Sequence, residues 1–165
     1  MQDAFMRRAL DIARQSIDEA GSLPYAAVVV KDGKIVGEGL NRVEGRFDPT
    51  SHGEVEAIRD ACRRLGTVNL SGCDLYTTAE PCSMCVATMY LSGIARLYYA
   101  SAAAESGTFL ETLAARDPKW IRPISGPTLR RETGLPMESR TMPAEAILSE
   151  EAHAIFDEFL RKRGF

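Results

Sequence analysis

Two short motifs hold the residue types that bind and use a metal ion: His-Gly-Glu at residues 52–54 and Pro-Cys-Ser-Met-Cys at residues 81–85. Each motif comes at the expected start of a helix, where free backbone N–H groups and the helix dipole favour the thiolate form of cysteine. One imidazole, from His52, and two thiolates, from Cys82 and Cys85, make a three-ligand zinc site. Three protein ligands leave a fourth position for water, which is typical of catalytic zinc.

Glu54 lies two residues after His52, close enough to reach a water at such a site without being a ligand itself. A carboxylate in that position can take a proton from the water and pass it to a leaving nitrogen. The motifs together therefore favour a zinc hydrolase in which Glu54 is the catalytic acid and base.

Taken alone, each motif fits other structures. A Cys-x-x-Cys pair also occurs as a redox couple, as half of a structural zinc site, or as two packed thiols. The chain has no second Cys-x-x-Cys to complete a four-thiolate site, and a redox couple has no reason to accompany His-x-Glu. A non-enzymatic binding module braced by zinc would have no use for Glu54. Catalytic zinc is the hypothesis that explains all four residues.

The elements around the motifs alternate between strand and helix. An Asp32-Gly33 pair between two apolar runs predicts a hairpin, and Gly66 predicts the end of the helix that follows His52. We expect strands at residues 25–30, 35–39, 74–78 and 95–100, and helices at residues 1–20, 54–65, 82–91, 109–115 and 149–163. This alternation predicts an α/β layered fold, and the absence of repeats or low-complexity linkers favours one domain over residues 1–165.

The composition of the chain limits the classes of partner that we expect it to bind. The 165 residues carry a net charge of −3, whereas nucleic-acid binding usually needs a basic excess. No uninterrupted apolar run reaches the ~20 residues of a membrane helix. The first 20 residues contain four acids and no continuous apolar core, so they lack the pattern of a targeting segment. We expect a cytoplasmic protein that uses its four cysteines as thiols and binds neither membrane nor nucleic acid.

His-x-Glu followed by Pro-Cys-x-x-Cys resembles the signature of the zinc-dependent cytidine deaminase superfamily. The resemblance extends from Pro24 to about Tyr99. It implies one Zn²⁺ per chain held by His52, Cys82 and Cys85, with Glu54 as the proton shuttle. The implied fold is three-layer α/β/α with a mixed five-stranded sheet, and the implied reaction is hydrolytic release of ammonia from an aminated heterocycle.

Several segments resemble the bacterial guanine deaminase branch. They are Pro24-Tyr25-Ala26-Ala27, the Glu-Gly-x-Asn pattern that ends at Asn41, Asp48-Pro49-Thr50, and an Arg-x-x-Pro element at residues 140–143 that precedes the last strand and helix of those enzymes. Guanine, converted to xanthine and ammonia, is therefore the first expected substrate. The resemblance also implies a homodimer in which residues 140–165 close over the partner subunit's active site.

The substrate contacts expected from the resemblance are of three kinds. The amide of Asn41 can both donate to and accept from a base edge, and the ring of Tyr25 can stack on a planar base. The segment just before Cys82 offers backbone groups, and the chain ends in an aromatic residue. The expected substrate-binding residues are Asn41, Tyr25, Ala79, Glu80, Pro81 and Phe165. An acidic contact to the base comes from either Glu105 or Glu111, if from either.

Two other substrates stay open. His-Gly-Glu with a central glycine is also the pattern of fungal-type cytosine deaminases, so cytosine or isocytosine is an alternative. The Asp-Pro-Thr segment is shared with tRNA adenosine deaminases, and the chain closes on a basic run at residues 161–163. Against RNA stands the negative net charge, and a basic triplet at a helix end commonly compensates the helix dipole.

Overall fold

The computed structural model describes residues 2–164, and these form two compact units that meet between Arg130 and Arg131. The first contains α1 (Gln2–Arg14), β1 (Leu23–Lys31), β2 (Lys34–Asn41), α2 (Val43–Arg46), α3 (Gly53–Leu65), β3 (Asp74–Ala79), α4 (Ser83–Ser92), β4 (Arg96–Ser101) and α5 (Ala103–Arg116), with short 3₁₀ turns at Gln15–Ile17 and Pro118–Trp120. Helix α6 (Gly126–Gly134) spans the boundary, and Met137–Ser139 and α7 (Ser149–Arg163) follow it.

The first unit is built on one mixed sheet with the strand order β2-β1-β3-β4. Strand β1 is antiparallel to both β2 and β3, whereas β3 and β4 run parallel, with Tyr76 opposite Tyr98. The hairpin between β1 and β2 turns at Asp32 and Gly33, both in the left-handed region, as the sequence predicted. The expected mixed sheet is confirmed.

The expectation of a fifth strand was wrong: the sheet of residues 2–164 has four. The segment that follows the Arg-x-x-Pro element, residues 144–148, has no regular structure and pairs with no other strand described. A strand is stable only when its backbone groups pair in a ladder. Leu148 also has φ +55°, which interrupts any extended backbone immediately before α7.

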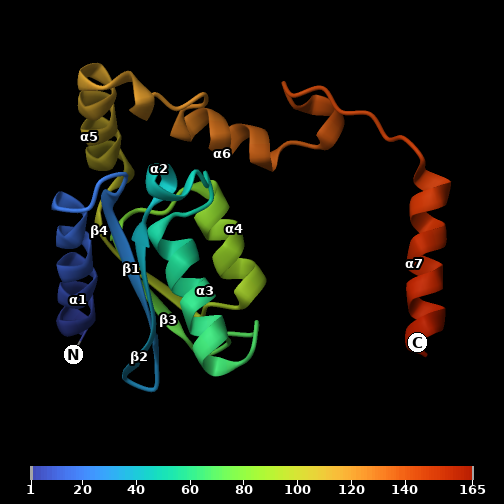
Figure 1. The fold of residues 1–165 in the computed structure, drawn as a ribbon, viewed down its shortest axis with the longest axis horizontal. Helices are drawn as coiled ribbons and strands as arrows, with labels where there is room; N and C mark the ends of the chain where they lie inside the picture. Colours follow the sequence, from blue (N-terminus) through green and yellow to red (C-terminus); the bar gives the residue numbers. More distant parts are fainter. Residues whose placement is uncertain (1, 165) are drawn as a thin grey trace. The chain divides into compact units, whose positions relative to one another are not determined.

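The two faces of the sheet build two apolar cores, so the three-layer arrangement is confirmed (Figure 1). Alternate residues of a strand point to opposite faces, and in β1 Val28 packs with Ile12 of α1, whereas Val29 packs with Ile58 of α3. Helix α4 covers the same face as α3, contributing Met89 to that core. Among the described residues, no helix combines the length and apolar character needed to cross a bilayer.

Helix α3 lies unusually close to the sheet because three glycines remove side chains at the contact. A Cβ atom on Gly39 would lie 2.2 Å from the carbonyl oxygen of Gly53 and 2.3 Å from the backbone nitrogen of Ala57. On Gly37 it would lie 2.3 Å from the Ala57 carbonyl oxygen, and on Gly53 it would lie 2.6 Å from the carbonyl oxygen of Tyr25. The backbone of α3 therefore packs directly against the backbones of β1 and β2, with no space for a side chain between them at these three positions.

Gly39→Ala is expected to lower the free energy of unfolding by about 3 kcal/mol, because the atoms that a Cβ would meet belong to the backbone of α3 and cannot rotate away. Gly107→Ala in α5 is the matched control: no atom lies within 4 Å of its Cβ position. That change should be neutral or raise stability by about 0.5–1 kcal/mol. Urea unfolding followed by circular dichroism measures both, and equal stabilities would show that the close contact is dispensable.

Candidate metal and catalytic site

The two motifs meet because α3 and α4 cover the same face of the sheet and begin side by side. His52 immediately precedes α3 and Cys82 immediately precedes α4, both in extended backbone conformation. Cys85 lies in the first turn of α4 and is fully buried. The structure thus brings His52, Cys82 and Cys85 together at two helix N-termini, where the dipoles favour anionic groups.

The three side chains fit a tetrahedral metal ion. The Sγ atoms of Cys82 and Cys85 are 3.6 Å apart, and they lie 3.7 Å and 3.4 Å, respectively, from Nδ1 of His52. Ordinary zinc bond lengths at tetrahedral angles separate two sulfurs by about 3.8 Å and a sulfur from a nitrogen by about 3.6 Å. Two sulfurs and one imidazole nitrogen are also the donor set that zinc prefers. The three groups therefore need almost no movement to hold one zinc ion.

The pKa values of the two thiols are shifted in opposite directions. The hydrogen bond between the two sulfurs lowers the pKa of Cys82 to about 3, with His52 contributing in the same direction. The hydrogen bond to Cys82 raises the pKa of Cys85, and burial and the carboxylate of Glu54 raise it further. The pair thus favours one thiolate and one thiol that share a proton, and a dication releases that remaining proton on binding.

Glu54 lies beside this cluster in the first turn of α3 and is only 5% exposed. Its Oε2 atom is 3.6 Å from Sγ of Cys85. Burial raises the pKa of Glu54, whereas a backbone hydrogen bond and the imidazole of His52 lower it in part. A carboxyl group poised in this way can hold and release a proton next to the metal position without being one of the three ligands.

Tyr25 forms part of the wall next to Glu54. Its backbone packs on Gly53, and its hydroxyl donates to the carbonyl oxygen of Ser106 in α5, at 3.2 Å. Burial raises the pKa of Tyr25 to about 12, and the charges of Arg122 and Glu54 act on the same hydroxyl in opposite directions. The ring meets Phe109 edge-on, with centroids 6.0 Å apart. Tyr25 therefore anchors α5 beside the cluster.

Asn41, the last residue of β2, is 1% exposed. Its Oδ1 atom accepts from the backbone N–H of Val43 at 3.3 Å and so shapes the start of the loop that leads to His52. The structure records no hydrogen bond between Asn41 and His52, Glu54 or either cysteine. Its position near the site follows from the contact of β2 with α3.

The segment before Cys82 is held in place by its neighbours. Ala79 is buried at the end of β3, Pro81 is buried too, and the Glu80 backbone N–H donates to Ser101 at 2.8 Å. The Glu80 carboxylate accepts from the backbone N–H of Ala103 at 2.9 Å, which ties this segment to the start of α5.

Of the two acidic candidates for a base contact, Glu105 is already engaged. Its carboxylate caps the first turn of α5 by accepting from the N–H of Ala102 at 2.9 Å and from the hydroxyl of Ser101 at 3.1 Å. Glu111 lies exposed further along the same helix. Phe165 lies outside the described residues.

Sequence reasoning missed two groups that shape this site. Thr78 of β3 accepts from the N–H of Ala26 at 3.1 Å and donates to the carbonyl oxygen of Pro24 at 3.3 Å, at the point where the pairing of β1 with β2 is irregular. Ser106 and Phe109 of α5 hold Tyr25, as described above. Both sets join residues more than fifty positions apart in the chain, so no local spacing signals them.

The sequence profile of the cytidine and deoxycytidylate deaminase zinc-binding region matches residues 1–101. Guanine deaminase of Bacillus subtilis is 43% identical over 108 residues, covering 64% of this chain and 69% of that protein. A tRNA-specific adenosine deaminase of Aquifex aeolicus is 42% identical over 100 residues, covering 61% of this chain and 66% of that protein. The alignments thus span about two thirds of the length of these relatives.

Solved structures that resemble this chain are deaminases as well. A crystal structure of Bacillus subtilis guanine deaminase superposes with a TM-score of 0.81 and 32% identity, covering all of this chain and 95% of that one. A structure from a study of A-to-I editing by tRNA:A34 deaminases has a TM-score of 0.57 and 41% identity, covering 63% of this chain and 79% of that one. With the profile matched and the donor set in place, the chain belongs to the cytidine and deoxycytidylate deaminase family and carries its zinc-binding region.

Proposed function

We propose that this deaminase acts on a free nucleobase and converts guanine to xanthine and ammonia. The observation that carries the proposal is the extent of the structural match. The guanine deaminase structure covers 100% of this chain, including the segment after residue 101, whereas the tRNA deaminase structure covers 63%. Sequence identity alone favours neither substrate, because the guanine and tRNA relatives are 43% and 42% identical.

In the proposed mechanism His52, Cys82 and Cys85 hold the zinc ion. When bound there, zinc supplies Lewis-acid chemistry and lowers the pKa of water towards ~7. Glu54 accepts one proton from the attacking water and delivers it to a ring nitrogen of the base. It then accepts the remaining proton of the added hydroxyl and delivers it to the amino group, which leaves as ammonia. Its burial excludes bulk water from that transfer.

Two walls orient the base in this proposal. We assign one base edge to the amide of Asn41, at the end of β2, and the stacking contact to the ring of Tyr25, whose hydroxyl feels the charge of Glu54. We assign further contacts to the backbone of Ala79, Glu80 and Pro81. The hydrogen bond from Tyr25 to Ser106 of α5 supports a role for α5 in holding Tyr25.

Replacing Glu54 tests the chemistry separately from metal binding. Glu54→Gln keeps all three donors of the cluster, so it should retain one zinc per chain while kcat falls by about 10²–10⁴-fold. Cys85→Ser removes one donor and should lose zinc as well as activity. Elemental analysis and an ammonia-release assay measure both quantities, and near-normal turnover of Glu54→Gln would refute the proposed proton transfer.

A substrate panel tests specificity. We expect ammonia release from guanine with a kcat/KM at least about 100-fold above that from cytosine or isocytosine, because a purine and a pyrimidine fill the same pocket differently. An anticodon stem-loop with adenosine at the wobble position is the third arm. Activity on the RNA alone would replace the free-base proposal by tRNA editing, and activity on cytosine alone would replace it by pyrimidine deamination.

We further propose that the working enzyme is a homodimer in which residues 140–165 close over the partner subunit's active site. In the first unit, α4 exposes Tyr90 and Leu91 at 84% and 88%. In the second, α7 exposes four large apolar side chains, those of Ile155, Phe156, Phe159 and Leu160. Exposed apolar surface of this extent on two separate helices favours burial against another chain.

Light scattering after size exclusion tests the dimer. The zinc-loaded protein should give about 36 kDa, twice the 18.1 kDa of one chain. Phe156→Asp/Phe159→Asp should shift it to the monomer mass, because two charges would then have to be buried in the interface. Asp157→Asn, on the same helix, is the control and should stay dimeric. A wild-type monomer would contradict the proposal without affecting the chemistry.

A further inference from the structure

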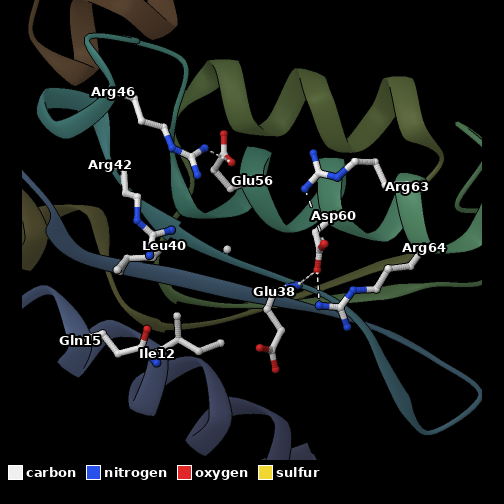
Figure 2. Close-up of a pocket in the computed structure, with 11 residues that line it drawn as sticks. Ile12, Gln15, Glu38, Leu40, Arg42, Arg46, Glu56, Asp60, Arg63 and Arg64 are labelled. Atoms are coloured by element: carbon white, nitrogen blue, oxygen red, sulfur yellow. Dashed lines mark hydrogen bonds and ion pairs between the residues drawn. The ribbon is translucent and has the colours of Figure 1, made fainter. Parts of the chain in front are cut away.

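A pocket of about 280 Å³ lies away from the metal cluster, along the outer edge of β2 (Figure 2). The end of α1, strand β2, the loop after it and the outward side of α3 surround this pocket. Its dominant feature is four guanidinium groups, from Arg42, Arg46, Arg63 and Arg64. Figure 2 shows Arg42 and Arg46 on one side of the opening and Arg63 and Arg64 on the other. Arginine side chains therefore line the pocket at both of its ends.

Three carboxylates also line the pocket, and two of them are neutralised partly by arginines from outside it. Glu38 accepts two hydrogen bonds from Arg8, both 2.8 Å long. Glu56, which is 7% exposed, pairs with Arg46 and also with Arg59, whose guanidinium is 2.7 Å away. Glu19, outside the pocket, binds Arg42 through both carboxylate oxygens, so Arg42, Arg46 and Arg64 each have a carboxylate partner. Arg63 is the lining arginine whose donors are least engaged.

The third carboxylate, Asp60, is saturated as well. It accepts from the backbone N–H of Glu38 at 3.1 Å and pairs with Arg64 at 2.7 Å. Arg63 reaches it only at 3.6 Å, and the Arg63 side chain is 68% exposed. Arg63 therefore has most of its five donors available to a ligand.

The edge of β2 adds backbone donors on the same side. The N–H of Glu38 points to Asp60, and the N–H of Arg42 donates to the carbonyl oxygen of Ser51 at 3.0 Å, so both face away from β1. Residues two apart in a strand direct their backbone groups the same way. The N–H of Leu40, which lies between them and is 1% exposed, therefore also faces the pocket.

We propose that this pocket binds the phosphate group of a phosphorylated ligand, at a site separate from the zinc centre. Guanidinium groups bind phosphate through paired N–H donors, and a sheltered backbone N–H strengthens the contact. The volume lies just below the roughly 300–1,000 Å³ of pockets that enclose drug-sized ligands. It accommodates a phosphate with at most a pentose, so any base or further chain would extend into solvent.

The protein as a whole is acidic, with a net charge of −3. The proposal therefore depends on the arginines gathered at this pocket and not on the overall charge. Anions are repelled on average, so saturable binding of phosphate needs a dedicated site. The two most exposed arginines of the pocket, Arg63 and Arg64, lie in the last turn of α3, whereas His52 and Glu54 lie at its start. Removing these two side chains leaves the metal cluster and the glycine contacts of α3 intact.

Isothermal titration calorimetry at low ionic strength tests the site with three ligands: inorganic phosphate, ribose 5-phosphate and a single-stranded RNA 12-mer. We expect saturable binding of phosphate and ribose 5-phosphate by the zinc-loaded protein. Arg63→Gln/Arg64→Gln should weaken it by roughly tenfold or more, because two charge-assisted contacts are lost. Arg7→Gln/Arg116→Gln removes the same charge from exposed positions outside the pocket and should bind as the wild type does.

The RNA arm distinguishes the source of the phosphate. RNA binding that exceeds that of ribose 5-phosphate and is weakened by Arg63→Gln/Arg64→Gln assigns the pocket to a nucleic-acid backbone, whereas weak RNA binding assigns it to a small phosphate ester. The absence of saturable phosphate binding overturns the proposal, as does an equal loss in both double variants. Zinc content of Arg63→Gln/Arg64→Gln, expected at one per chain, confirms that any loss of phosphate binding is local.

Discussion

The site depends on how closely α3 approaches the sheet. Three glycines, at positions 37, 39 and 53, leave no room for a Cβ atom between the helix and strands β1 and β2. This contact fixes the start of α3, where His52 immediately precedes the helix and the buried Glu54 lies in its first turn. The metal donors are then completed by α4, which starts after β3 on the same face. A side chain at any of the three positions would displace the helix by an ångström or more, and catalysis is lost by displacements of that size.

Local patterns were sufficient to predict the cluster, because its members lie at the starts of two helices with recognisable periodicity. His52, Glu54, Cys82 and Cys85 come together as the motifs indicated, and the predicted layered α/β fold has a core on each face of the sheet. The contacts of the glycines were not predictable in the same way. A glycine inside a strand usually weakens it, and the sequence around Gly37 and Gly39 gives no other signal. Only the tertiary packing shows that the backbone of α3 leaves no room for a side chain at these two positions.

Other features could not be predicted because they are decided by distant residues. The bond from Tyr25 to Ser106 joins residues 81 positions apart, and it makes α5 part of the site. Glu105, a candidate for contacting the base, caps α5 instead, since the helix start satisfies its carboxylate locally. The prediction of a fifth strand was wrong for a related reason. A strand needs a partner for its ladder, and residues 144–148 find none among the described residues of this chain.

The family profile covers the metal site together with most of the residues that we assign to substrate binding. The donor set and Glu54 lie within residues 1–101, the stretch that the family profile matches. Relatives named for guanine and for tRNA match this chain almost equally well, with 43% and 42% identity over 108 and 100 residues, so identity does not separate the two substrates. The structural matches differ more in extent. The guanine deaminase structure covers all of this chain, including α5 and the segments that follow, whereas the tRNA deaminase structure covers 63%, which is why the extent of the match and not the identity supports the proposed substrate.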